Sequence, residues 1–218
     1  MASLLMHLYV GKKIVERYPQ IIDHPQFYLG CIISDSVNID GLAEKAVRWA
    51  AHIRSNNINE WYDNNIDYYH SNLGNTNRDL LLGYVVHNIT DAAFDEFFSK
   101  TVQDGLSKMG KKPLSTFSLR WDDCFRFDYD QSKECWWRRE VLPNLKKAYP
   151  IEINGIKSEY VSILISNIIK QEHFDFPEGN PLIITTVLMD VLSNIVCKII
   201  DMFIFDGWES LKSQTHRE

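Results

Sequence analysis

The sequence lacks the features that mark several common classes of protein. It has four cysteines, Cys31, Cys124, Cys135 and Cys197, and no pair among them has CxxC spacing. A zinc knuckle built on thiolates is therefore not predicted. The first residues contain neither a basic segment nor a long apolar stretch. Together with the wide spacing of the cysteines, this predicts reduced thiols in a cytoplasmic protein.

Long hydrophobic runs and an excess of positive charge are also missing. The longest apolar region, residues 182–205, is interrupted by five polar residues, which argues against a membrane span. The formal net charge is -6 and the sequence pI is near 5.6, whereas proteins that bind duplex nucleic acid normally present a basic face. We therefore expect a soluble protein without a duplex partner, and no pattern predicts its oligomeric state.

Helix signals extend along most of the chain. With 218 residues, 45% of them hydrophobic, the chain is long enough for one domain with a sizeable core. Because no segment alternates apolar and polar residues, we predict a single all-α domain over residues 1–218, with its motifs concentrated in residues 1–100. Helices are expected over residues 3–18, 24–30, 40–54, 77–100, 132–149 and 158–172, from residue 59, and from residue 180 onward.

Residues 105–129 carry the weakest helix signal and are predicted to form a long connection. Within and just beyond them, the segment 121–130 (WDDCFRFDYD) mixes aromatic and acidic residues. It either lines a cleft and selects the substrate or forms a packed loop whose acids face water, and the composition favours the second slightly. The following tryptophans, Trp136 and Trp137, are expected in the core, with Arg138 and Arg139 in solvent.

His87 and Asp91 are the first pair of residues that indicates chemistry. They lie one helical turn apart, on the stripe that also carries Leu80, Gly83 and Tyr84. Burial of a carboxylate on such an apolar stripe is costly unless the carboxylate is paired or bound to a cation. Imidazole and carboxylate together suit zinc, iron or manganese.

Three further residues have similar surroundings. His7 lies among leucines of the first predicted helix, His52 ends an Ala- and Val-rich helix, and Asp35 closes an apolar run. A metal site in a helix bundle needs such ligands on several helices. Each candidate also has a structural interpretation: a core or capping histidine for His7, a helix cap or turn residue for Asp35, a solvated helix end for His52, and an intrahelical hydrogen-bonded pair for His87 with Asp91.

The order of these motifs resembles the bacterial zinc-dependent phospholipase C family and, through it, the S1/P1-type nucleases, in particular their short leaderless members. The resemblance includes His7 in the first helix, Asp35 after residues 30–33, the tripeptide at residues 52–54, and residues 82–91 with their His and Asp. It implies an all-α domain of the phospholipase C/P1 nuclease type. It also implies two zinc ions, with Asp91 bridging them. The first ion would be held by Asp35, His52, His87 and Asp91, and the second by His7 and Asp91. The resemblance further implies that Asp35 serves as general base.

Family members carry a further His, His and Glu set downstream, and this sequence does not. After Asp91 only His173 and His216 remain, and neither has Glu at the fourth following position. These two, with His24 and His70, are predicted to be structural or surface residues.

Two functions from different classes follow from these observations. The first is a hydrolase of phosphoric esters, either phosphodiesters or phospholipid-like molecules, in which one or two zinc ions activate a water molecule and Arg54 contacts a non-bridging oxygen. The alternative for Arg54 is an exposed surface arginine. The second function is a metal-binding but non-catalytic regulatory or scaffolding protein, and a helical interaction protein without metal is a third.

Overall fold

The computed structural model describes residues 2–113, 118–170 and 179–202. Within these ranges the chain forms helices and no strand, with only two isolated β-bridges, so the predicted all-α class is confirmed. The helices are α1 (Leu4–Arg17), α2 (His24–Ile33), the 3-10 helix η1 (Ser34–Asn38), α3 (Lys45–Ala51), α4 (Ile58–Asn72), α5 (Arg78–Phe97), α6 (Ser99–Lys108), α7 (Leu119–Gln131), the π-helix η2 (Trp137–Val141), α8 (Leu142–Leu145), α9 (Ser158–Lys170) and α10 (Thr186–Ile200).

Side-chain caps determine several of the helix starts. Asp23 caps α2 by accepting a hydrogen bond from the backbone N–H of Gln26, as predicted. Asn77, rather than Thr76, caps α5, since its side chain accepts hydrogen bonds from the backbone N–H groups of Asp79 and Leu80 in the first turn. The helix expected from residue 40 begins only at Lys45, because Gly41 has φ +113°, which no α-helix contains.

The prediction of a long connection over residues 105–129 was wrong. The segment contains the end of α6 and most of α7, and α7 buries Leu119, Cys124 and Phe127. The interpretation of its acids as water-facing was also wrong, because Asp122, Asp123 and Asp128 are buried. Because acids occupy several positions on the buried face of α7, apolar residues do not recur there at regular helical spacing. The sequence pattern therefore did not predict this helix.

Two of these buried acids hold other parts of the chain. Asp123 accepts hydrogen bonds from the backbone N–H groups of residues 182–184 at 2.6–2.9 Å, which keeps that segment non-helical before α10. Asp128 accepts from the Ser3 hydroxyl at 2.6 Å and from the Leu5 N–H at 3.1 Å. Asp128 therefore caps the start of α1 from a distant helix and fixes the position of the chain's first residues.

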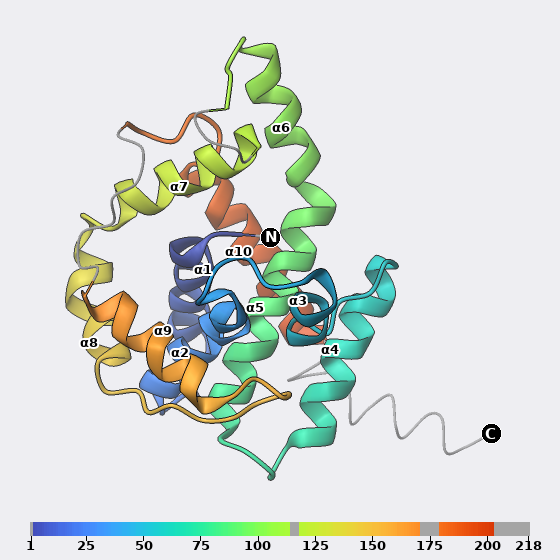
Figure 1. Ribbon diagram of the computed structural model, residues 1–218, viewed down its shortest axis with the longest axis vertical. Helices are drawn as coiled ribbons and strands as arrows, with labels where there is room; N and C mark the ends of the chain where they lie inside the picture. Colours follow the sequence, from blue (N-terminus) through green and yellow to red (C-terminus); the bar gives the residue numbers. More distant parts are fainter. Residues whose placement is uncertain (1, 114–117, 171–178, 203–218) are drawn as a thin grey trace.

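Helix α5 (green in Figure 1) runs through the middle of the fold, and residues 79–94 of it are all buried. Its closest partner is α2, and two glycines allow the close approach. A Cβ on Gly83 would lie 2.1 Å from the carbonyl oxygen of Phe27, and one on Gly30 would lie 2.3 Å from that of Leu80. The two backbones therefore touch at this crossing, one turn before His87.

The substitution Gly83→Ala is expected to destabilise the fold by about 3 kcal/mol or more, because overpacking a rigid backbone contact forces the helices apart. Urea denaturation of the variant measures this loss. Gly105→Ala is the matched control, since the added Cβ would meet only the end of the Ile183 side chain. Equal stability of Gly83→Ala and the wild type would contradict the backbone contact.

The remaining expectations for the core are partly confirmed. Trp137 is fully buried and Trp136 partly so, while Arg138 and Arg139 are exposed. Among the described helices, none is both long and apolar enough to cross a bilayer.

Candidate metal centre

The five residues predicted as metal ligands come from four separate elements and meet at one place. His7 belongs to α1, Asp35 to η1, His52 is the C-cap of α3, and His87 and Asp91 lie on α5. The four side chains other than that of Asp35 are at most 1% exposed, and Asp35 is 27% exposed. The cluster is thus buried, with one carboxylate at its edge.

Backbone carbonyls set the orientation of two imidazoles. Nδ1 of His52 lies 2.7 Å from the carbonyl oxygen of Arg48, and Nδ1 of His87 lies 2.8 Å from that of Cys31. A carbonyl oxygen only accepts, so each Nδ1 carries the proton. In the neutral form of each ring, the lone pair then lies on Nε2, the atom that faces the cluster.

The two Nε2 atoms of His52 and His87 are 3.2 Å apart. Two lone pairs at this distance repel each other unless a proton or a cation lies between them. Tetrahedral zinc with Zn–N bonds of about 2.0–2.1 Å separates two nitrogen ligands by about 3.3 Å. The arrangement therefore fits a metal ion held by both rings.

Both carboxylates border the same space. Nε2 of His52 is 3.5 Å from Oδ1 of Asp35 and 3.6 Å from Oδ2 of Asp91, and Nε2 of His87 is 3.9 Å from the same Asp91 oxygen. These separations resemble those between ligands of one ion. Asp35, His52 and His87 could therefore hold one metal ion, and Oδ2 of Asp91 lies beside the two imidazoles of this group.

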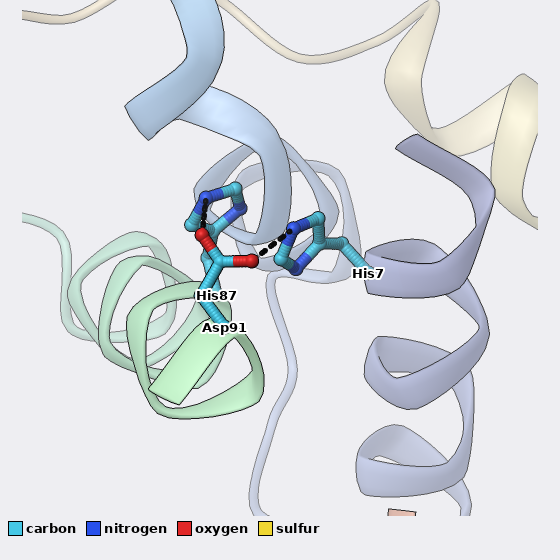
Figure 2. A group of neighbouring side chains, drawn as sticks. All are labelled: His7, His87 and Asp91. Carbon is cyan, nitrogen blue, oxygen red and sulfur yellow. Dashed lines mark ion pairs between the residues drawn. The ribbon is translucent and has the colours of Figure 1, made fainter. Parts of the chain in front are cut away.

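The other oxygen of Asp91 faces His7 (Figure 2). Oδ1 lies 3.4 Å from Nε2 of His7 and accepts a hydrogen bond of 2.6 Å from the backbone N–H of Ala2. His7 stacks on His87, with ring centroids 3.7 Å apart. Neither ring nitrogen of His7 has a hydrogen-bond partner, although both are buried. A buried imidazole whose two nitrogens have no hydrogen-bond partner needs an explanation, and a second ion shared with Asp91 would supply one.

The electrostatics distinguish the two facing imidazoles. Burial, together with the neighbouring His7, lowers the pKa of His87 to about 3. Burial alone would lower the pKa of His52, but its interactions with Asp35 and Asp91 raise it. Conversely, burial alone would raise the pKa of Asp91, and interactions with neighbouring groups, among them His7 and His87, lower this pKa well below its usual range. His87 is thus a neutral imidazole beside carboxylates that stay ionised.

Local structure explains how His52 reaches the cluster. Three carbonyl groups at the end of α3 accept side-chain hydrogen bonds: that of Ala51 from the Tyr84 hydroxyl at 2.6 Å, that of His52 from the Trp61 indole at 2.9 Å, and that of Ala50 from the Asn154 amide at 2.9 Å. The next residue, Ile53, has φ +48°, a left-handed conformation that is rare for a β-branched residue. These bonds hold the chain in a turn that directs His52 inward, so the interpretation of His52 as a solvated helix end was wrong.

Comparison with protein-family models, with curated proteins and with solved structures finds no match to this chain. Its site is therefore described from its own geometry.

Among the described residues, the two other histidines, His24 and His70, lie outside the cluster. His24 is half-buried, with Nε2 3.1 Å from the carbonyl oxygen of Ile21, and His70 lies on α4 beside Tyr69. His173 and His216 lie outside the described residues. Within the described ranges, the groups His7 with His87 and Asp91, and Asp35 with His52 and His87, lie at metal-ligand distance, and both belong to this cluster.

A cleft of about 830 Å³ opens beside the cluster at Asp35. It combines cationic, acidic and apolar residues, and its volume suits a small molecule or one end of a larger one. It is lined by Ala2, Ser3, Leu4, Asp35, Asn38, Gly41, Leu42, Arg48, Arg54, Asp95, Ser99, Arg120, Trp121, Phe125 and Asp128.

Arg54 lies in this cleft, and its side chain is only 25% exposed. Its interpretation as an exposed surface arginine was therefore wrong. Sequence reasoning missed Asp95, although it continues the His87–Asp91 stripe by one more turn. It also missed Arg120, which lies within the stretch interpreted as a connection.

Proposed function

We propose that this protein is a metal-dependent hydrolase of phosphoric esters, with zinc as the metal and iron or manganese as other candidates. The observation that carries the proposal is the buried cluster of three imidazoles and two carboxylates beside a cleft that contains arginines. When bound at such a cluster, zinc lowers the pKa of a water molecule toward neutrality and supplies a nucleophile. A small phosphodiester or the head of a phospholipid-like molecule is the proposed substrate.

Asp35 is the proposed general base. It is the one cluster residue that lines the cleft, so its carboxylate reaches both the ligands and the entering substrate. Its interactions with His52 and His87 lower its pKa, although burial alone would raise it. An ionised carboxylate there accepts the proton of the attacking water and keeps that water oriented.

Arg54 is the proposed contact to a non-bridging phosphate oxygen. It follows His52 by two residues, and its guanidinium lies 4.5 Å from the ring centroid of Trp61 and 5.4 Å from that of Trp49. These contacts hold the side chain in place without consuming its N–H donors. A guanidinium fixed in this way presents its fork to the phosphate without first losing conformational entropy.

The alternative function, a non-catalytic metal-binding protein with a regulatory or scaffolding role, is favoured by one observation. Four of the five ligand side chains are at most 1% exposed, so an ion there has only the edge at Asp35 open to the cleft. A closed site of this kind is typical of structural zinc.

Turnover by the Asp35→Asn variant separates the two functions. We expect the zinc-loaded wild type to hydrolyse bis(p-nitrophenyl) phosphate, and the variant to lose about 100-fold or more in kcat, because loss of a general base typically costs that much. Release of p-nitrophenol measures the rate, and metal content is measured in parallel. The matched control is Asp104→Asn, which removes an exposed carboxylate paired with Lys100. Stoichiometric metal without turnover in any protein would instead support the non-catalytic function.

A further inference from the structure

On one wall of the cleft, two arginines donate hydrogen bonds to the same carboxylate. Asp95, on α5, accepts a hydrogen bond from Nη2 of Arg54 at 2.8 Å and from Nη1 of Arg120 at 3.4 Å. The three residues come from the segment after α3, from α5 and from α7, so the fold alone brings them together. Two guanidinium groups around one carboxylate leave a net positive charge on this wall.

The arginine pair is adjacent to the metal cluster. Asp95 follows Asp91 by four residues on α5, which places it on the same face and about 6 Å further along the helix. Arg54 follows His52 by two residues. Both arginines and Asp35 line the same cleft. A ligand bound at the cluster therefore needs only a few bonds to reach the pair.

Packing holds Arg120 as firmly as Arg54. Its side chain is 18% exposed, its Nη1 donates to the hydroxyl of Ser99, and its guanidinium lies 5.7 Å from the ring centroid of Trp121 and 6.0 Å from that of Phe94. The guanidinium has five N–H donors, and these contacts use only part of them. Arg120 is thus preorganised inside the cleft, unlike a mobile surface arginine.

We propose that Arg120, held beside Arg54 by Asp95, forms a subsite for a second phosphate-like anion of the ligand whose first phosphate binds at the metal cluster and Arg54. This inference rests on the proposed function for the place of the first group. It extends that function by naming the substrate class: phosphoesters that carry two anionic groups a few bonds apart. Arg120 binds the second group and discriminates against esters with a single charge.

Binding of non-hydrolysable phosphonates to the zinc-loaded protein tests the subsite without any turnover. Methylphosphonate is compared by calorimetry with diphosphonates that have one to four methylenes between the two groups. We expect at least one diphosphonate to bind wild type about tenfold or more tighter than methylphosphonate, since charge-assisted hydrogen bonds are worth at least that much. The advantage should fall below about threefold in Arg120→Gln and persist in Arg126→Gln, which changes an arginine of α7 outside the cleft.

Metal content and helical circular dichroism are measured for every variant. Should Arg120→Gln fail to fold, Arg120→Lys replaces it and is expected to keep only part of the advantage, because lysine retains the charge without the fork. An equal advantage in wild type and Arg120→Gln would mean that both groups bind the metal, and no advantage in wild type would mean that the subsite is absent; either result overturns the proposal. If the advantage depends on Arg120 but no ester is hydrolysed, the subsite stands and the proposed hydrolase activity does not.

Discussion

The Asp91→Asn variant is expected to lose most of its bound metal and all measurable phosphodiesterase activity. The two oxygens of Asp91 face different histidines, His7 on one side and His52 with His87 on the other. Replacing the carboxylate by an amide of nearly the same shape removes a negative ligand from both halves of the cluster. We expect metal affinity to fall by about 100-fold or more, since even residues outside the ligand sphere can cost 10- to 100-fold.

Elemental analysis of the purified proteins, without added metal, measures this loss. Wild type should carry one or two zinc, iron or manganese ions per chain. His87→Ala should also lose its metal, although it leaves a cavity in the core, whereas Asp91→Asn keeps the volume and is the cleaner variant. His24→Ala, which removes a histidine outside the cluster, should retain the metal. Wild type without metal even after reconstitution would mean that the histidines are structural and that the hydrolase proposal is wrong.

Removal of the metal is expected to lower the melting temperature of wild type by about 10 °C. A ligand that binds only the folded state, at a free concentration of about 1,000 times its dissociation constant, stabilises that state by about 4 kcal/mol. For a domain of this length, each kcal/mol corresponds to about 2–4 °C. Without the ion, the two Nε2 atoms at 3.2 Å are left to share a proton.

Differential scanning calorimetry with zinc and with a chelator measures the shift. The Asp91→Asn variant provides the control, because its melting temperature should respond little to either addition. Identical transitions of wild type under both conditions would show that the cluster is satisfied by protons alone. A shift of equal size in wild type and Asp91→Asn would place the metal elsewhere on the chain.

Several features of the fold were predictable because they depend on short-range patterns. The all-α class follows from apolar residues at helical spacing, and the cap at Asp23 follows from local side-chain chemistry, whereas the cap of α5 lies at Asn77, one residue after the predicted Thr76. The pairing of His87 with Asp91 follows from a spacing of one turn. The helix α7 was missed because Asp123 and Asp128 occupy its buried face, where they bind backbone groups distant in the sequence.

Residue types and helical spacing were enough to identify the candidate ligands and the face of α5 on which two of them lie. The convergence of His7, Asp35 and His52 on that face depends on long-range packing, since it requires the crossing at Gly30 and Gly83 and the turn at Ile53. The arrangement of charged residues in the cleft also depends on tertiary packing. Arg54, Asp95 and Arg120 are distant along the chain, and no spacing rule links them, so their shared charge arises only where three elements pack together.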